Sequence, residues 1–287
     1  MTALRALVLV PVLALALAPT GRALARSGGE LVPSALGEAR LKTDFALAFR
    51  IAEADVLEVI PVDVDPKGDH PGAIAGRYRE RDGRWAFPGL AVYIPCGRER
   101  CVAPVSLGSA ATRVAGLEAI DLDAPRRELM TELPRYPPRT APPPLVHPTW
   151  PAVVVGVERD GQSPQTTSLV IVSLVGRELP FVVADLALSD ERPQPTPEEA
   201  ARTHVPSFVT YGASLTKVVL ETLGDTSTAK ARATAFHRLT TTVLPIGSRT
   251  SLCSAPKPYD VVYELDLARS WRYETRADNP PPRRPCE

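Results

Sequence analysis

The chain has 287 residues and equal numbers of basic and acidic side chains, 33 of each, so it has no net charge when histidine is neutral. Such a balance provides no long-range attraction for polyanions, and we therefore expect no nucleic-acid partner. Apolar residues make up 44% of the chain, enough for a buried core, whereas 31 prolines predict short regular elements joined by stiff loops.

Residues 1–25 have the features of a signal peptide. Arg5 supplies a positive charge near the start, residues 6–18 are uncharged, and small residues precede the expected cleavage point, so the mature chain should begin at Arg26. A retained membrane anchor is the less favoured alternative, because a spanning helix needs about 20 apolar residues. We expect an exported protein, periplasmic or extracellular, with no membrane span after cleavage. Arginine far outnumbers lysine, which is typical of GC-rich bacterial coding.

The first part of the mature chain combines one helix with short strands. Apolar residues recur at helical spacing over 37–53 and predict an amphipathic helix. A β-branched run over 56–64 predicts a strand, and Pro61 within it indicates an edge strand or a bulge. Residues 65–89 are rich in glycine, proline and charge and are expected to form an exposed excursion, followed by a short strand over 90–94.

A second helix and a proline-rich segment come next. Asp123 followed by Pro125 is a typical helix start, and it predicts a helix over 123–133. Residues 134–151 contain eight prolines, which favours an extended linker between two lobes. The alternative is a long loop wrapped around a single domain.

The second part of the mature chain carries the strongest strand signal. Three β-branched runs over 152–188, separated by turn residues, predict an antiparallel meander, and they are apolar on both faces, so both faces should be covered. The expected covers are helices, and one further half-buried strand follows at 259–267. These helices are predicted at residues 196–206, 215–223 and 228–240.

The expected architecture is therefore an α+β protein, with a central antiparallel meander flanked by helices, rich in loops and proline and stapled by disulfides. The expected domain order is an N-terminal α+β lobe (26–133), the linker (134–151), a C-terminal α+β lobe (152–279) and a proline-rich tail (280–287).

All four cysteines lie in the mature chain, and an even number in an exported protein predicts two disulfides. The favoured pairs are Cys96 with Cys101 and Cys253 with Cys286, although three connectivities are open. The alternatives are a zinc site made by all four thiolates and a redox pair at Cys96 and Cys101. Both fit the spacing less well, since no C-x-x-C motif is present.

The segment from Ser214 to Lys217 resembles the S-x-x-K motif of penicillin-binding proteins and serine β-lactamases. In those families the lysine lies one helical turn from the serine and helps to accept its hydroxyl proton. The S-x-N or Y-x-N and K-T-G elements that accompany it there are absent from this sequence. The favoured interpretation is that Ser214 caps a helix and that Lys217 faces solvent beside Glu221.

Other candidate ligands and aromatic residues are scattered. Residues 63–70 begin like a calcium loop, but Lys67 and Ile74 occupy ligand positions, so a solvated turn is favoured. We expect His237 to lie on the solvent face of a helix. The histidines, none in an H-x-x-x-H pair, are His70, His147, His204 and His237. The tryptophans, which either line a groove or pack in the core, are Trp85, Trp150 and Trp271.

These observations favour a noncatalytic binding or structural protein of the bacterial envelope, with no cofactor and no metal, whose partner is an unidentified envelope protein or polymer. The competing hypothesis is a serine hydrolase that acts on envelope polymers through Ser214 and Lys217.

Overall fold

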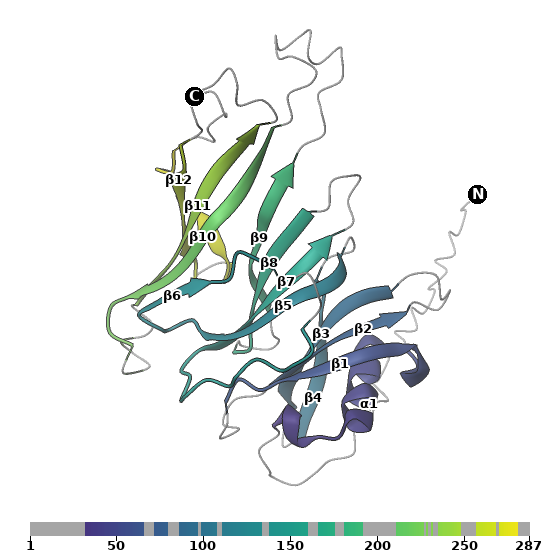
Figure 1. Ribbon diagram of the computed structural model, residues 1–287. Helices are drawn as coiled ribbons and strands as arrows, with labels where there is room; N and C mark the ends of the chain where they lie inside the picture. Colours follow the sequence, from purple (N-terminus) through teal and green to yellow (C-terminus); the bar gives the residue numbers. More distant parts are fainter. Residues whose placement is uncertain are drawn as a thin grey trace, which may run out of the picture.

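Antiparallel β-sheets form most of the protein (Figure 1). The computed structural model describes residues 32–65, 72–79, 86–96, 99–107, 111–133, 138–159, 166–175, 181–191, 211–226, 228, 231, 235–247, 257–267 and 270–280. The α+β prediction is wrong, because the described residues contain a single α-helix and the predicted meander is covered by further strands.

The first sheet contains four strands in the order β1-β2-β3-β4, joined by consecutive antiparallel pairings. The strands are β1 (Val56–Val62), β2 (Ala73–Arg79), β3 (Ala86–Cys96) and β4 (Glu99–Val105). Pro61 lies on β1, the edge strand, as its missing N–H group predicts. The exposed excursion expected over 65–89 is wrong, since most of this segment's described residues belong to β2 and β3.

Helix α1 (Glu38–Phe49) covers the outer face of this sheet, and this confirms the first predicted helix. Gly76 and Gly89 are opposite each other on β2 and β3. A Cβ atom on Gly76 would lie 2.8 Å from the Phe45 ring, and one on Gly89 would lie 2.4 Å from the Phe49 ring. The paired glycines therefore provide the space that the two aromatic rings of the helix need. Short 3₁₀ helices flank α1 at η1 (Pro33–Ala35) and η2 (Glu53–Asp55).

The second sheet contains nine strands in the order β13-β12-β11-β10-β9-β8-β7-β5, with β6 paired to β10 outside this path. Its N-terminal members are β5 (Ala111–Asp121), β6 (Arg126–Leu129), β7 (Pro151–Arg159), β8 (Thr166–Ser173) and β9 (Phe181–Glu191). Its C-terminal members are β10 (Tyr211–Leu223), β11 (Phe236–Gly247), β12 (Tyr259–Leu265) and β13 (Tyr273–Thr275). Strands β7, β8 and β9 form the predicted antiparallel meander.

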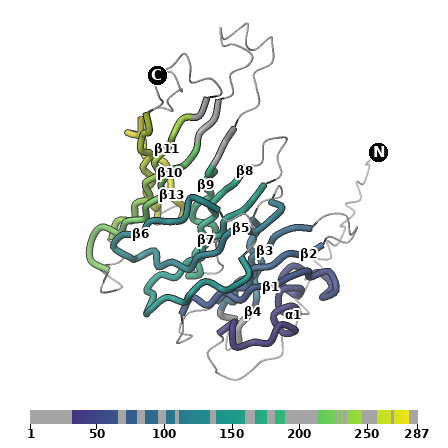
Figure 2. The backbone as a smooth tube through the Cα atoms, viewed as in Figure 1, coloured from purple at the N-terminus to yellow at the C-terminus, as the bar shows by residue number. Residues whose placement is uncertain are grey.

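Strands β5, β7, β8 and β9 form a middle layer that is buried on both faces. Val153 and Val155 pack against the first sheet, whereas Val154 between them packs against the C-terminal strands. Helix, first sheet, middle strands and C-terminal strands follow one another across the molecule in Figure 2. The prediction that both faces of the meander are covered is confirmed, but the covers are sheets.

Two predicted helices are strands. Residues 215–223 lie within β10, where Val218, Val219 and Leu220 are all buried, as in a strand packed on both faces. From residue 236 onwards the helix predicted over 228–240 is strand β11, which continues through the β-branched run from Thr240 to Val243. The helix predicted over 196–206 lies outside the described residues.

The helix predicted over 123–133 is also wrong. Residues 126–129 form strand β6, which pairs with β10. Asp123 does not cap a helix, because its carboxylate contacts His237 across the core. Tertiary contacts therefore outweigh the local helix-start signal.

The described end of the proline-rich segment, residues 138–151, is anchored to the body at two points. The amide of Leu145 donates to the carbonyl of Val64 at 3.1 Å, and Trp150 is buried. Strands β5 and β7, on either side of the segment, are hydrogen-bonded to each other, so the two predicted lobes share one sheet and one core.

Cys101, on β4, is in the disulfide-bonded state. No disulfide has both of its cysteines among the described side chains, so the stapled architecture expected from the sequence is not seen. The side chains of Cys96, Cys253 and Cys286 lie outside the described set, and the two favoured pairings stay predictions.

Candidate functional site

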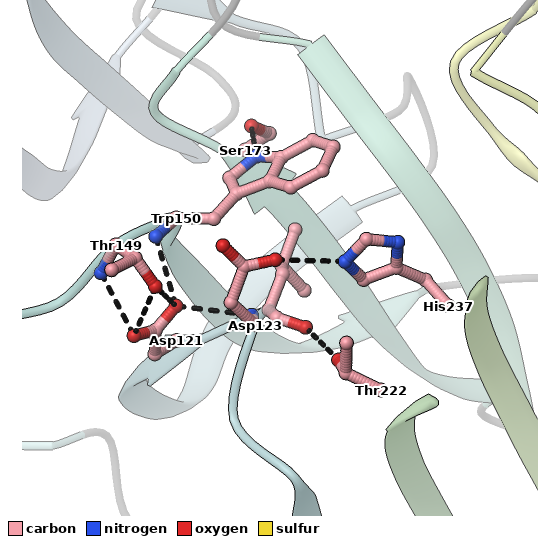
Figure 3. A network of polar contacts seen from close by, with 8 residues as sticks. Asp121, Asp123, Thr149, Trp150, Ser173, Thr222 and His237 are labelled. Atoms are coloured by element: carbon pink, nitrogen blue, oxygen red, sulfur yellow. Dashed lines mark hydrogen bonds and ion pairs between the residues drawn. The ribbon is translucent and has the colours of Figure 1, made fainter. Parts of the chain in front are cut away.

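A buried contact between Asp123 and His237 joins the middle layer to the C-terminal strands (Figure 3). Oδ1 of Asp123 and Nε2 of His237 are 2.8 Å apart, and their side chains are 0% and 1% exposed. Asp123 lies in the turn after β5, whereas His237 lies on β11 opposite Thr222 of β10. The Thr222 hydroxyl donates to the carbonyl of Leu122 at 2.7 Å, so the same turn is tied to both strands.

Asp121 organises this turn. Its carboxylate accepts hydrogen bonds from the backbone amides of Asp123 at 3.0 Å, Thr149 at 2.9 Å and Trp150 at 2.9 Å. An aspartate that accepts from the amide two residues on is typical of a tight turn. The end of the proline-rich segment is thereby attached to the end of β5, and Trp150 enters the core.

Trp150 lies at the centre of the network. Its indole N–H donates to the Ser173 hydroxyl at 2.8 Å, and this hydroxyl donates to the carbonyl of Val175 at 2.7 Å. The indole meets the His237 ring edge-on at 5.1 Å and the Trp271 ring at 6.0 Å between centroids. Figure 3 shows the indole above the Asp123–His237 pair. The network therefore extends to the segment that precedes β13.

That segment is a tight turn in a strained conformation. Trp271 has a φ of 54°, which is unusual for a bulky residue, and its amide donates to the carbonyl of Asp266 at 2.7 Å. The amide of Asp266 in turn donates to the carbonyl of Arg272 at 3.0 Å. Burial raises the pKa of the Tyr273 phenol, and the charge of Asp123 raises it further. Tyr273 is therefore neutral, and its position beside the buried pair is set by the same turn.

The polar network of Asp121, Asp123, Trp150, Thr222 and His237 has the features of a structural clasp, and we call it the clasp. Catalytic histidines exchange protons with substrate and must be reachable, whereas His237 is sealed in the core. The two nearest hydroxyl groups of the network, on Ser173 and Thr222, donate to backbone carbonyls. Nδ1 of His237 is buried and has no hydrogen-bond partner among the described residues. In the part of the chain that the structure describes, no three histidine, cysteine or acidic side chains are grouped to hold a metal ion.

A pocket of about 430 Å³ lies beside the first half of β9. Apolar side chains of β8 and β9 form much of its lining, and one wall is the Arg272–Tyr273 segment that the clasp supports. Ser106 and Leu107, which follow β4, form another wall. The full lining is Ser106, Leu107, Val170, Val182, Val183, Ala184, Asp185, Arg272 and Tyr273.

The two charged side chains that line the pocket, Asp185 and Arg272, differ in their ion pairing. Asp185 forms an ion pair with Arg159, with 2.8 Å between the carboxylate and the guanidinium. Arg272 is exposed, and its guanidinium forms no ion pair with any residue that the structure describes. The pocket therefore combines apolar side chains of β8 and β9 with one available cation.

The backbone of β9 is also available at the pocket. Residues 181–188 pair with β8 on one side, whereas β10 pairs with β9 only at residues 189–191. Beyond residue 214, β10 diverges from β9 and pairs with β6 instead (Figure 1). Among the described strands, none occupies the second edge of β9 over residues 181–188.

Ser214 and Lys217 lie on strand β10, so the helical turn that relates serine and lysine in the S-x-x-K families is not present. A register shift separates Leu215 from Lys217, and Lys217 forms an ion pair with Glu128 of β6 at 3.3 Å. Neither residue lines the pocket.

The structure changes the interpretation of the other candidates. The solvent-facing position predicted for His237 is wrong, since the residue is buried. Trp150 and Trp271 pack against each other in the core. Asp63 accepts a hydrogen bond from the Ser34 amide at 3.0 Å, and Asp65 is buried, so neither lies in a solvated turn. His147 is described in the proline-rich segment, whereas His70, Trp85 and His204 lie outside the described residues.

Comparison with known protein families, curated proteins and solved structures gives no significant match. No helix in the described ranges is long and apolar enough to cross a membrane.

Proposed function

We propose that the chain is an exported, noncatalytic binding protein of the bacterial envelope, and that its ligand occupies the pocket beside β9. The observation that carries this proposal is the pocket itself, where apolar side chains of β8 and β9 meet an available guanidinium and an open strand edge. Binding sites commonly combine apolar walls with a few placed polar groups.

The chemistry of the pocket favours binding over catalysis. Its described lining contains no histidine, lysine or cysteine, and its carboxylate, Asp185, is held in an ion pair by Arg159. Ser214 and Lys217 lie outside this lining and on a strand, and the buried Asp123–His237 pair is out of reach of substrate.

Two observations support export. The first is the leader-like composition of residues 1–25. The second is the disulfide-bonded state of Cys101, because disulfides persist mainly in oxidising compartments.

A ligand screen on the mature protein tests the proposal. We expect ligand-observed NMR to detect short aliphatic carboxylates such as pentanoate, which match an apolar lining with one cation. Ser106→Trp places an indole at the exposed rim and should abolish binding. The control is Ala187→Trp, because this residue is exposed on β9 but outside the pocket lining, and it should leave binding unchanged.

Covalent labelling by a fluorescent penicillin provides the contrary result. If the protein is labelled and Ser214→Ala removes the label, the hydrolase hypothesis replaces this proposal. If pentanoate binding is absent from the unmodified protein, or persists in Ser106→Trp, the pocket is not the binding site.

A further inference from the structure

We infer that the pocket binds an extended peptide of a partner protein, which adds as a strand to the open edge of β9 and places a carboxylate against Arg272. The inference rests on the proposed function and adds the chemical class of the ligand.

The first step concerns the backbone of β9. In an antiparallel ladder, alternate residues direct their N–H and C=O groups to opposite neighbours. Over residues 181–188 one set of these groups bonds to β8, and the other faces the side on which no described strand is paired. Backbone polar groups are obligatory hydrogen-bonding groups, and an open edge is a template for another strand. Peptide recognition by strand addition uses such edges.

The second step concerns the shape of the pocket, which encloses the edge instead of lying on one face. Val170 and Val182 belong to the core between the middle layer and the first sheet. Val183 and Ala184 belong to the core on the other side of the middle layer. Because all four line the pocket, it reaches both faces of the sheet at the β9 edge.

The enclosing walls decide between a peptide and a second copy of the chain. Leu107 continues from the first sheet and packs in the first core, whereas Tyr273 packs in the second. A single strand needs about 4.8 Å beside β9, but a continuous sheet edge from a second copy would bring its own packed layers, about 10 Å away on each face. These layers would meet the two walls. The pocket is therefore a slot between Leu107 and Tyr273 beside β9, and this slot favours a lone strand.

The third step concerns charge. Asp185 is already neutralised by Arg159, and Arg272 has no acidic partner in the described part of the chain. The clasp holds the segment of Arg272 in place through Trp271 and Tyr273, so the guanidinium is presented by a fixed turn. A guanidinium binds a carboxylate through paired hydrogen bonds. The carboxylate is supplied either by an acidic side chain or by a peptide C-terminus.

The chain's own tail is a poor occupant. Residues 280–287 contain four prolines, which have no N–H group for a ladder. We therefore assign the slot to a partner peptide.

Fluorescence anisotropy with labelled peptides tests the inference on the full mature protein. The probe is the sequence Thr-Val-Thr-Glu-Val-Thr with an amidated C-terminus. A second probe replaces Glu with Gln and has a free C-terminus, so the two distinguish the sources of the carboxylate. We expect saturable binding of at least one probe, and N-methylation of alternate peptide amides should abolish it.

Variants of the protein test the two contacts separately. Arg272→Gln should weaken binding about tenfold or more, since a hydrogen bond to a charged group contributes about 1.5–3 kcal/mol and 1.4 kcal/mol is tenfold. The matched control is Arg79→Gln, at an exposed arginine at the end of β2, which should leave affinity unchanged. Bound peptide should also slow the hydrogen exchange of β9 amides.

The outcomes separate this inference from the proposed function. If pentanoate binds in the slot but neither peptide does, the strand-addition inference is wrong and the binding function remains. If neither pentanoate nor peptide binds, both are wrong. If the free protein sediments as a dimer that the peptide dissociates, a second copy is the occupant and the inference is overturned.

Discussion

Replacing His237 with leucine removes the partner that Asp123 has on β11. Both side chains are fully enclosed, and their polar atoms are 2.8 Å apart. Removing the partner of a buried carboxylate costs about 3–5 kcal/mol, because the carboxylate stays buried without its hydrogen bond. We therefore expect His237→Leu to lower the free energy of unfolding by about 3–5 kcal/mol.

The size of the effect depends on the hydrogen bond and not on the ring alone. His237→Gln offers an amide N–H near the position of Nε2 and should recover part of the loss. The exposed neighbour on the same strand, Phe236→Leu, is the control and should change stability by less than about 1 kcal/mol.

Urea unfolding of the mature protein measures these differences through the midpoint at constant slope. On the usual scale of about 2–4 °C per kcal/mol, the leucine variant should also melt about 6–20 °C lower. A double-mutant cycle with Asp123→Asn should give a coupling energy above about 1 kcal/mol. A loss below 1 kcal/mol for His237→Leu, or a coupling near zero, would refute the clasp.

Two further predictions concern burial and space. Burial raises the pKa values of Tyr93 and Tyr273, so both phenols keep their protons in the folded protein after unfolded tyrosines ionise near pH 10. The folded state then binds more protons than the unfolded state, so stability should fall as pH rises above about 10. Urea unfolding at pH 8 to 11 should show this fall, and Tyr273→Phe should reduce it. An equal fall in the variant would contradict the raised pKa of Tyr273. Gly76→Ala places a Cβ atom 2.7 Å from the Glu58 carbonyl and 2.8 Å from the Phe45 ring, so it should cost about 1–3 kcal/mol. Gly37→Ala, at the N-cap of α1 with nothing within 4 Å of the added atom, should change stability by less than about 1 kcal/mol in the same assay, and equal effects at the two positions would contradict the packing of α1.

The sequence predicts the meander because its signal is local. Val153, Val154 and Val155 are consecutive β-branched residues, and such a run indicates a strand buried on both faces. The helix over 37–53 is predicted for the same reason, because its apolar residues recur at helical spacing and cover one sheet face.

Strands β10 and β11 were missed because helical spacing competed with strand composition, whereas β12 confirms the strand predicted over 259–267. Leu215, Val218, Val219 and Leu223 fit one helical face, but Leu220 is as buried as Val218 and Val219, whereas Leu223 is exposed. The β-branched content of this segment and of residues 240–243 was the signal for strands. Without these strands, the covers of the meander were wrongly assigned to helices.

The clasp and the slot have no local signal in the sequence. Asp123 and His237 are 114 positions apart, and each has a plausible local role that the structure does not use. The slot is assembled from β9, the residues after β4 and the turn before β13, so only the strand order reveals it.

The most direct test of the binding site is an NMR titration of the mature, isotope-labelled protein with the Thr-Val-Thr-Glu-Val-Thr amide and the Thr-Val-Thr-Gln-Val-Thr free acid. The binding account predicts that amide shifts concentrate at residues 182–188, 106–107 and 272–273, with little change at Ser214 and Lys217. Shifts concentrated on β10 around Ser214, or none at the β9 edge at saturating peptide, would contradict it.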